Sequence, residues 1–441
     1  MKDTIAAIST PFGEGAIAIA RLSGERAVAI ADKVFRGRLP LAEAETRRQF
    51  FGRIFDGGKF LDEVLASVHR APASYTGEDV VEISCHGGIL VTREILRVLL
   101  ESGARAANPG EFTERAFLNG KLDLTQAEAV MDLITAKTNL ALRAAAEQLE
   151  GRLGEKIGAL RAMLLRLLAH LEASIDFPEE DIDPETGEIL LRSLDQIAAA
   201  NDALLRTAAQ GRILREGVRT VICGAPNVGK SSLLNRLLGY ERAIVSEHPG
   251  TTRDTIEEVI SFRGVPLRLV DTAGLRDSGD AVEKAGMERT LKSIERADLV
   301  LHLVDGSRPR SEVPWAAEHG KEEILVLNKK DLGEDPAWKA IRGVRISCLT
   351  GEGLDQLADE VSRRLLGGNM DSGDSLVAIS ARHQACLKAA AGCCEAARRA
   401  LLDRSSPELI ALELRAALDA VGEVVGKADA EELLGEIFST F

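Results

Sequence analysis

The segment GAPNVGKS, residues 224–231, constrains this chain most, because it fits the pattern GxxxxGK[ST]. The residues VRTVIC before it predict a strand, and SLLNRLL after it predicts a helix. In such a strand–loop–helix unit, backbone N–H groups surround phosphate oxygens at the positive end of the helix. A chance glycine-rich turn does not explain Lys-Ser together with both flanking elements. The motif therefore predicts a nucleotide site in which Lys230 contacts the β- and γ-phosphates and Ser231 binds Mg²⁺.

Two further motifs follow in the order typical of a GTPase. PGTTRD, residues 249–254, contains Thr252, whose hydroxyl can reach Mg²⁺ and sense the γ-phosphate. DTAG, residues 271–274, ends a predicted strand. We expect Asp271 to bind Mg²⁺ through water and Gly274 to donate its N–H to the γ-phosphate.

The motif NKKD, residues 328–331, predicts which base is bound. Asp331 can accept hydrogen bonds from guanine N1–H and N2–H₂, a pattern that adenine cannot match. SCLTG, residues 347–351, follows the last predicted strand and is expected to support the guanine ring. The residues expected to contact GTP are Asn227, Val228, Gly229, Lys230, Ser231, Ser232, Ser246, Glu247, His248, Pro249, Gly250, Thr251, Thr252, Asp271, Thr272, Ala273, Gly274, Asn328, Lys329, Asp331, Ser347, Cys348 and Leu349.

The residue that orients the attacking water is not the usual one. Many small GTPases place a Gln directly after DTAG, whereas this chain has Leu275, which cannot form a hydrogen bond. Either hydrolysis is slow or another group positions the water, and Glu283 is the candidate. Its alternative role is that of an exposed Glu at a helix start, and the residue chemistry alone supports both equally.

Composition limits the class of protein. The 441 residues suggest two to four domains, and the net charge of −14 argues against nucleic-acid binding over the whole surface. Any RNA is expected to bind at a local patch or beside a more basic partner. No apolar run is long enough to span a membrane, and no signal peptide is seen. The six Cys lack metal-site spacing, so we expect reduced thiols in a cytoplasmic protein without a membrane partner.

The first part of the chain, residues 1–118, reads as mixed α/β. Strands are predicted at Thr4–Ser9, Ala16–Leu22 and Val80–Cys85, and a helix at Ile89–Glu101.

Residues 119–215 are rich in Ala, Leu, Glu and Arg and predict helices. One helix carries apolar residues in alternating steps of four and three, ending before Phe177-Pro178. These residues fit a dimerising seam or the core of a helical bundle, and the bundle core is favoured because heptads are not sustained. They are Leu153, Ile157, Leu160, Leu164, Leu167 and Leu171. The acidic run that follows, residues 179–183, is expected to be a solvated loop rather than a metal site.

Residues 216–375 alternate strands with helices and predict a parallel sheet, and residues 376–441 are helical again. The simplest arrangement is one helical domain, 119–215 and 376–441, that is split by an inserted GTPase domain. The predicted strands of this inserted domain are Val218–Cys223, Pro266–Val270, Leu299–Asp305, Ile324–Leu327 and Val344–Ser347.

Beyond these motifs, the whole sequence resembles the MnmE (TrmE) family of tRNA-modification GTPases, within the TrmE-Era-EngA-YihA-Septin-like superfamily. The resemblance runs from residue 4 to residue 441 and is carried by long segments outside the shared GTPase core. They include TPFGEGAIAIARLSG (10–24), YTGEDVVEISCHGG (75–88), PGEFTERAFLNGKLDLTQAEAVMDLI (109–134), DFPEEDI (176–182) and LLGEIFSTF (433–441).

The resemblance implies an α/β plus all-α fold with three domains: an N-terminal α+β tetrahydrofolate-binding domain, a split central helical domain and an inserted Ras-like P-loop G domain. It implies a homodimer, formed through the N-terminal domain, that joins the flavin-binding partner MnmG in a heterotetramer. Together they add an aminomethyl or carboxymethylaminomethyl group at C5 of the wobble uridine, position 34, of certain tRNAs. A 5-formyl- or methylene-tetrahydrofolate supplies the one-carbon unit, and GTP hydrolysis drives the cycle.

The resemblance also implies activation by K⁺ and by dimerisation across the nucleotides. A monovalent cation beside the β- and γ-phosphates can offset transition-state charge as an arginine finger does. Asn227 matches the family's side-chain ligand for K⁺, and backbone oxygens of Ser246, His248 and Thr251 match the others. Glu283 matches the family's water-positioning residue, so Glu283 and Lys230 become the candidate catalytic residues.

For the folate, the resemblance implies contacts from Arg21, Glu82 and Lys121. A Glu can pair with donors of a pteridine edge, and Arg or Lys with carboxylates. Without the resemblance, an ordinary surface salt bridge is the favoured role for each of these residues.

The family pattern continues after the IFSTF segment with a short tail, Cys-Ile-Gly-Lys or close to it, whereas this sequence ends at Phe441. The tail's Cys is implicated in the modification chemistry and its Lys in the folate site. Either the sequence is shortened, or this member lacks the tail. If the lack is real, we expect GTP hydrolysis to persist, while tRNA modification stays an open question. Cys386, Cys393 and Cys394 are not expected to replace it.

Two other functions are compatible with the G-domain motifs. A ribosome-assembly GTPase of the Era or EngA kind would carry a second GxxxxGK[ST] or a basic RNA-binding tail, and the sequence has neither. A switch that binds GTP and only recruits MnmG is the second alternative.

Overall fold

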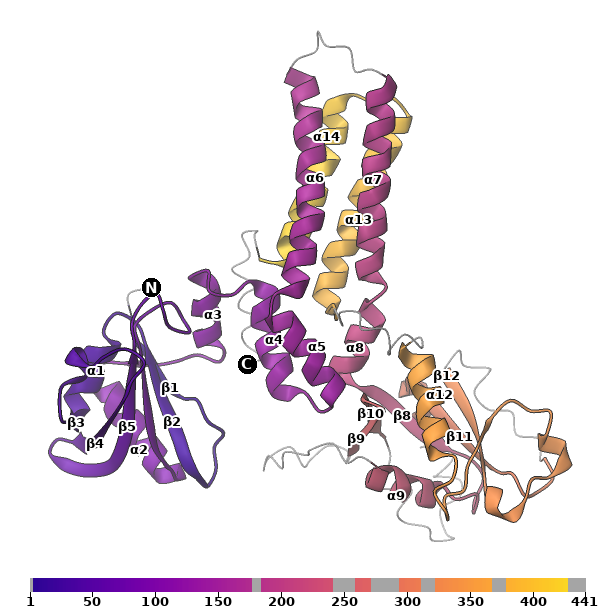
Figure 1. Ribbon diagram of the computed structural model, residues 1–441, viewed down its shortest axis with the longest axis horizontal. Helices are drawn as coiled ribbons and strands as arrows, with labels where there is room; N and C mark the ends of the chain where they lie inside the picture. The colour runs from indigo at the N-terminus through magenta and orange to yellow at the C-terminus, as the bar shows by residue number, and fades with distance from the viewer. Residues whose placement is uncertain are drawn as a thin grey trace. The chain divides into compact units, whose positions relative to one another are not determined.

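The computed structural model describes residues 3–176, 184–240, 258–270, 293–310, 322–366 and 378–426. The chain forms two compact units, Met1–Met131 with Val425–Phe441, and Asp132–Val424. The boundary falls within one helix, α4 (Leu124–Thr135). Figure 1 labels the elements of both units.

The first unit is built on a seven-stranded sheet in the order β3-β4-β5-β6-β2-β1-β7. All neighbouring strands are antiparallel except β1 and β7. Helices α1 (Ala27–Val34) and α2 (Ile89–Glu101) bury their apolar residues with those of the sheet in one core. The strands are β1 (Ile5–Ile8), β2 (Gly15–Ser23), β3 (Phe35–Gly37), β4 (Gln49–Asp56), β5 (Lys59–His69), β6 (Val80–Gly87) and β7 (Arg105–Ala106).

The three strands and the helix predicted for this region are confirmed. The sequence prediction missed the β4–β5 hairpin, which turns at Gly57 and Gly58, both with positive φ. Its outward positions mix apolar and charged side chains, with Phe51, Arg53 and Leu65 exposed. Because the exposed face of these strands is not uniformly polar, their sequence lacks the regular alternation of apolar and polar residues that predicts a strand.

A buried ionic cluster joins α3 (Glu111–Leu118) to the sheet region of this unit. The Arg115 side chain is 1% exposed and donates to Glu111, Glu78 and Asp3, all at 2.9–3.1 Å. Ser23 donates to Glu78 at 2.7 Å. Since a buried guanidinium needs carboxylate partners, this cluster fixes α3 relative to residues 76–78.

The helical part of the second unit contains four long helices that run side by side in Figure 1. They are α6 (Arg152–Asp176), α7 (Pro184–Leu205), α13 (Ala381–Leu402) and α14 (Pro407–Val424). The leucine and isoleucine positions spaced by four and three in α6 are all buried within this chain, so the bundle-core interpretation is confirmed and the dimerising seam is wrong. The helix ends at Asp176, before Phe177-Pro178, and the acidic run lies outside the described residues.

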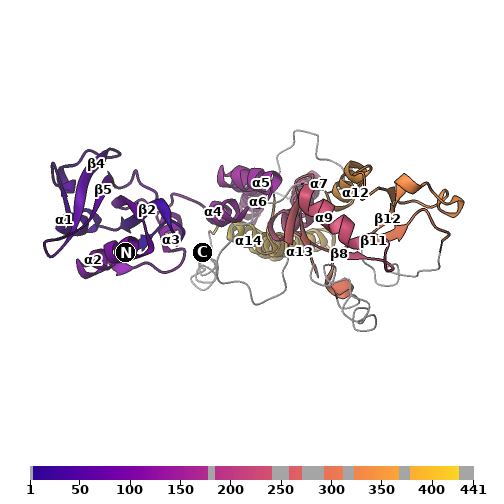
Figure 2. The same cartoon turned by 90° about the horizontal axis from the view of Figure 1, so that it is seen from below.

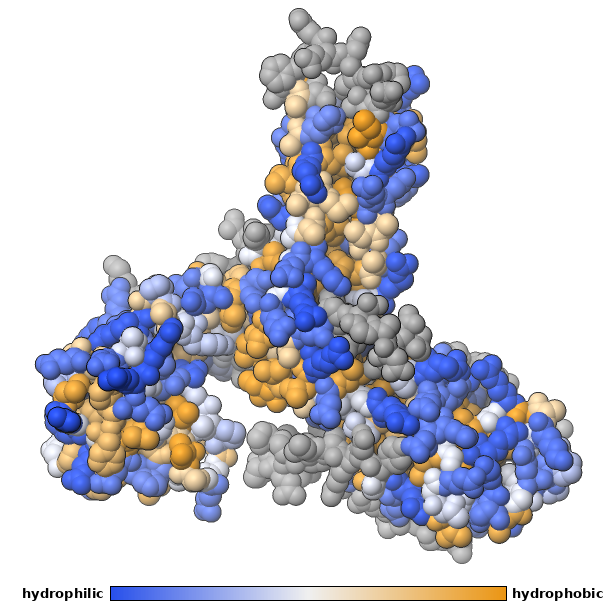
Figure 3. All heavy atoms as spheres, in the orientation of Figure 1, coloured by the Kyte–Doolittle hydropathy of each residue, from blue (hydrophilic) through white to orange (hydrophobic). Residues whose placement is uncertain are grey.

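Two shorter helices, α5 (Asn139–Leu149) and α8 (Ala208–Glu216), contact each other, and α8 leads directly into β8 (Val218–Cys223) of the second sheet. Gly211 allows α8 to touch the chain as it returns from that sheet, because a Cβ there would lie 2.5 Å from the Ile379 carbonyl oxygen. Figure 3 shows apolar atoms over the α4–α5 region, where Ile134 and Leu142 are exposed.

The second sheet has six strands in the order β13-β12-β11-β8-β10-β9. It is parallel except for the β9–β10 hairpin. Helices α9 (Lys230–Tyr240) and α12 (Leu354–Leu366) share one core with the strands, beside which Figures 1 and 2 show them. The strands are β8 (Val218–Cys223), β9 (Glu258–Phe262), β10 (Val265–Leu269), β11 (Leu299–Asp305), β12 (Glu322–Asn328) and β13 (Val344–Arg345).

All five strands predicted for this sheet are present, and β9 was missed. It pairs with β10 through a two-residue turn in which Arg263 and Gly264 both have positive φ. Such turns favour Asn-Gly or Asp-Gly, and Arg-Gly gave no hairpin signal. Among the described helices of the chain, none is both long and apolar enough to cross a bilayer.

Candidate nucleotide-binding site

The glycine-rich loop runs between β8 and α9, as the sequence predicts. A Cβ at Gly224 would lie 2.1 Å from the Leu303 carbonyl oxygen, and one at Gly229 would lie 2.3 Å from Asn328 Nδ2. Gly224 has φ +147°, Gly229 has +104°, and the exposed Asn227 has +59°. The backbone can therefore take this tight path only with glycine at the two contact points.

Lys230 begins α9 and lies across the loop that precedes it. Its Nζ donates to the carbonyl oxygens of Gly224 at 3.0 Å and Ala225 at 2.9 Å. Burial lowers the pKa of Lys230. Ser231 and Ser232 follow in the exposed first turn of the helix, where N–H groups favour anions. The loop thus places an ammonium group, a hydroxyl and a helix N-terminus together.

Asn328 connects this loop to the segment that follows β13. Its buried Nδ2 donates to the Val228 carbonyl at 2.8 Å, and its Oδ1 accepts from the Cys348 N–H at 2.9 Å. The first and last predicted motifs are therefore held together by one side chain.

Asp331 and Ser347 meet at the other end of the same region. The Ser347 hydroxyl donates to the Asp331 carboxylate at 2.5 Å and accepts from the Thr350 N–H at 3.1 Å. Asp331 is exposed, so its carboxylate is available to a ligand. Arg236 of α9 donates to the carbonyls of Cys348 and Leu349, which ties the last loop back to the helix of the first.

Asp305 is a residue of this site that the sequence analysis missed. Its Oδ2 lies 2.7 Å from Lys329 Nζ, and its Oδ1 accepts from the N–H and hydroxyl of Ser307. Burial acts to raise the pKa of Asp305, but hydrogen bonds from Lys329 and Ser307 outweigh it and hold that pKa below its ordinary value. Lys329 has φ +65°, which a non-glycine residue seldom adopts. Asp305 of β11 pairs with Asn328 of β12, and this pairing is visible only in the folded sheet, so no local sequence pattern identified Asp305.

The structure thus brings together the predicted residues of the first and last motifs, namely Asn227, Val228, Gly229, Lys230, Ser231, Ser232, Asn328, Lys329, Asp331, Ser347, Cys348 and Leu349. The other predicted residues lie outside the described residues. They are Ser246, Glu247, His248, Pro249, Gly250, Thr251, Thr252, Asp271, Thr272, Ala273, Gly274 and Glu283.

The three residues predicted to bind folate lie in the first unit around the segment 72–82. Arg21 and Glu82 face each other on β2 and β6 and form an ion pair at 2.7 Å. The Arg21 guanidinium also lies 5.6 Å from the Tyr75 ring centroid and 5.7 Å from that of Phe112. Lys121 donates to the Pro72 carbonyl at 3.1 Å. The structure therefore pairs Arg21 with Glu82 and places Lys121 against the loop that supplies Tyr75.

None of the six cysteines is disulfide-bonded. Burial raises the pKa of Cys394 to about 11 and that of Cys223 to about 12. It also raises the pKa of Cys386 and Cys393. Because the thiolate is the nucleophile, burial disfavours the reactive form of the three cysteines of α13.

Comparisons with known proteins cover both units. A family model described as the MnmE helical domain matches residues 124–441, and one described as the GTP-binding protein TrmE N-terminus matches residues 4–121. The curated tRNA modification GTPase MnmE of Akkermansia muciniphila is 50% identical over 99% of this chain and 98% of its own length. That of Natranaerobius thermophilus is 46% identical over 100% of this chain and 99% of its own. Among solved structures, the G domain of the T. maritima FeoB iron transporter aligns with 34% of this chain and 98% of its own, at 25% identity and a TM-score of 0.23.

Proposed function

Because the chain belongs to the MnmE family of tRNA modification GTPases, we propose that it is a K⁺-activated GTPase that acts with MnmG on the wobble uridine, position 34, of tRNA. The reaction adds an aminomethyl or carboxymethylaminomethyl group at C5. The observation that carries the nucleotide part is the Asn328 clamp, which joins the phosphate-binding loop to the loop after β13. The phosphate-binding loop and the Asp331 carboxylate, which recognises guanine in this proposal, then belong to one site.

The described residues account for binding and charge compensation. In this proposal, Lys230, whose Nζ donates to the Gly224 carbonyl of the loop, and the N-terminus of α9 bind the β- and γ-phosphates. Asp331, which accepts from the Ser347 hydroxyl, also accepts from guanine N1–H and N2–H₂. Glu283 positions the attacking water in this proposal, since Leu275 cannot.

The donor set suits the two cations that the family implies. Ser231 with Thr252, and Asp271 through water, offer the hard oxygen ligands that Mg²⁺ prefers. Ser231 is exposed in the first turn of α9, next to Lys230, which fits this role. Asn227 is exposed in the loop and offers an amide oxygen to K⁺, with backbone oxygens of Ser246, His248 and Thr251 as the other ligands. Both cations offset phosphate charge when bound.

For the one-carbon donor, we place a 5-formyl- or methylene-tetrahydrofolate beside Arg21, Glu82 and Lys121. The Arg21–Glu82 pair lies beside two aromatic rings, so a flat, polar heterocycle finds both stacking and hydrogen-bonding groups there. We further propose three domains: the folate-binding domain 1–118, the helical domain 119–215 with 376–441, and the G domain 216–375. The chain forms a homodimer, which joins MnmG in a heterotetramer.

The test is nucleoside analysis of tRNA from a strain that lacks its own MnmE but retains MnmG. Expression of this chain is expected to restore the modified wobble uridine, and its K230A variant is expected not to. Unmodified uridine with the wild-type chain, despite normal GTP turnover, would instead identify a GTP-dependent switch that recruits MnmG without supporting the chemistry.

A further inference from the structure

The turn of the β9–β10 hairpin contacts helix α5 within the second unit. Arg263 has φ +51° and Gly264 has φ +82°. A Cβ added to Gly264 would lie 3.1 Å from the Leu140 Cβ, tighter than most contacts of this kind. The backbone of the turn therefore lies directly against the Leu140 side chain, near the start of α5.

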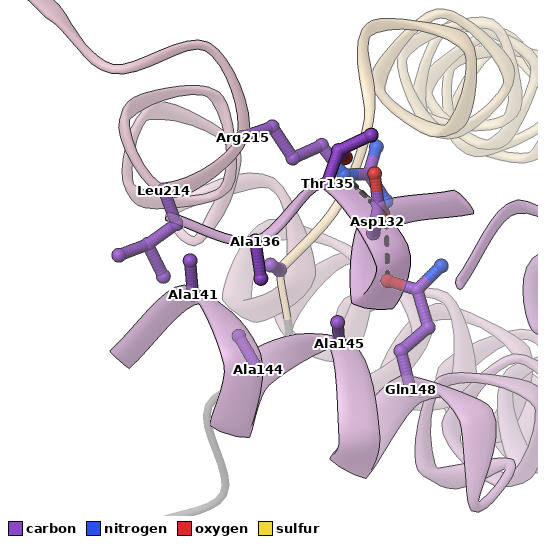
Figure 4. A pocket seen from close by; sticks show the side chains of 10 residues that line it. Asp132, Thr135, Ala136, Ala141, Ala144, Ala145, Gln148, Leu214 and Arg215 are labelled. Atoms are coloured by element: carbon purple, nitrogen blue, oxygen red, sulfur yellow. Dashed lines mark hydrogen bonds and ion pairs between the residues drawn. The ribbon is translucent and has the colours of Figure 1, made fainter. Parts of the chain in front are cut away.

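Leu140 belongs to two apolar clusters at once. It packs against the core of the six-stranded sheet, which includes Phe262 and Val265 of the hairpin. It also packs against the small cluster of Ala141, Ala144, Leu214 and Ala378. Figure 4 shows three members of the second cluster, Ala141, Ala144 and Leu214, facing one another between α5 and α8. A side chain shared by two clusters transmits displacement between them, because packed interiors deform little.

Polar contacts of Arg215 join α8 to α4 and α5 beside this small cluster. Arg215 of α8 forms an ion pair with Asp132 of α4 at 2.7 Å and donates to Gln148 of α5 at 3.2 Å, as Figure 4 shows. Arg215 stands two residues before Gly217, where the chain turns into β8 and the phosphate-binding loop. Helix α5 thus contacts both the hairpin and the end of α8, which precedes β8 and the nucleotide-binding loop.

Gly264 of the turn contacts Leu140 of α5, while Phe262 and Val265 on either side of the turn pack in the core of the sheet. Arg263 of the same turn forms ion pairs with Asp359 at 3.1 Å and Asp355 at 3.6 Å, and all three side chains are at least half exposed. Exposed ion pairs of this kind contribute little. The contact that positions the turn against α5 is therefore the one between Gly264 and Leu140.

The hairpin also lies between two predicted nucleotide-binding motifs in the sequence. Residues 258–270 connect the segment that contains Thr252 to the DTAG motif that begins at Asp271. Since β9 and β10 are hydrogen-bonded along their length, the hairpin moves as a unit when either end is displaced. We propose that Leu140 couples the nucleotide state of the G domain to α5, through the Arg263–Gly264 turn. This inference rests on the proposed function, because it needs a nucleotide that contacts Thr252 and Asp271.

Hydrogen–deuterium exchange of the full chain tests the coupling. Exchange is compared without nucleotide and with a non-hydrolysable GTP analogue, Mg²⁺ and KCl, in the wild type and in L140A, L140M and L142A. Leu142 is the matched control, because it lies on the same helix, is exposed and belongs to neither cluster. L140M retains side-chain volume and so serves as the conservative variant if L140A loses stability.

The wild type, L142A and L140M are expected to show a nucleotide-dependent change in exchange over residues 132–149. L140A is expected to lose this change while it binds the analogue with unchanged affinity. A wild-type response that persists in L140A overturns the coupling, and so does the absence of any response in a wild type that binds the analogue. Failure of the wild type to bind the analogue would instead contradict the proposed function.

Discussion

The hydroxyl of Ser347 donates a hydrogen bond of 2.5 Å to the carboxylate of Asp331, so a residue after β13 orients a residue after β12. If this carboxylate reads guanine N1–H and N2–H₂, replacing it with an amide presents a donor to the base. D331N should then bind GTP roughly 10- to 150-fold more weakly, the effect of about 1.5–3 kcal/mol for hydrogen bonds to a charged group. Competition binding with a fluorescent GDP analogue measures this change.

The matched ligand for the same variant is XTP, because its C2 carbonyl accepts a hydrogen bond from the Asn amide at the position where the guanine amino group donates one. D331N should prefer XTP over GTP, and the wild type the reverse. Equal weakening for both nucleotides would place Asp331 away from the base.

The Asp305–Lys329 pair predicts a second effect on affinity. D305N removes the ionic partner that holds Lys329 in its left-handed backbone position. The pair is partly exposed, so we expect a loss of about 1 kcal/mol, or roughly a fivefold rise in KM for GTP, with kcat unchanged. D335N is the control, because Asp335 lies nearby and its side chain caps a short turn at Ala337. A fall in kcat alone would contradict a role in nucleotide positioning.

The buried Arg115 cluster predicts where the first unit is most sensitive. R115M leaves Glu78 and Glu111 without their shared partner in a buried region, which should lower the free energy of unfolding by about 3–5 kcal/mol. R53M breaks the half-exposed pair with Glu63 and should cost about 1 kcal/mol or less. Chemical denaturation followed by a probe in the N-terminal unit compares the two variants, and equal losses would refute the importance of burial.

Acid should weaken the same cluster. Burial acts to raise the pKa of Glu111, but hydrogen bonds from Arg105, the Asn108 N–H and Arg115 hold it below its ordinary value of 4.5. A carboxyl with a depressed folded-state pKa stabilises the fold above its unfolded pKa and loses this effect as pH falls. The unfolding free energy of the first unit should therefore decline below about pH 4.5, less steeply in E111Q. A steeper decline in E111Q would contradict the assignment.

The sequence alone was sufficient where one segment forms a complete local unit. GAPNVGKS between a strand and a helix predicted the loop between β8 and α9, and Lys230 lies at the start of α9. It did not predict Asp305, because that residue meets Lys329 only through the register of β11 and β12. The β9–β10 hairpin was missed for a related reason, since Arg263-Gly264 is not a typical hairpin turn. Tertiary pairing, which no local pattern contains, placed both.

The folate residues show the same limit. Arg21, Glu82 and Lys121 are ordinary charged residues in the sequence, and only the resemblance singled them out. The pairing of β2 with β6 brings the first two together, and Tyr75 and Phe112 join them from segments that the local pattern did not connect.

Phosphate release from GTP, measured with Mg²⁺ in KCl and in NaCl at equal ionic strength, tests the proposed activity most directly. The account predicts turnover that K⁺ stimulates and that the K230A variant loses. No turnover in either salt, or equal turnover in both, would contradict it.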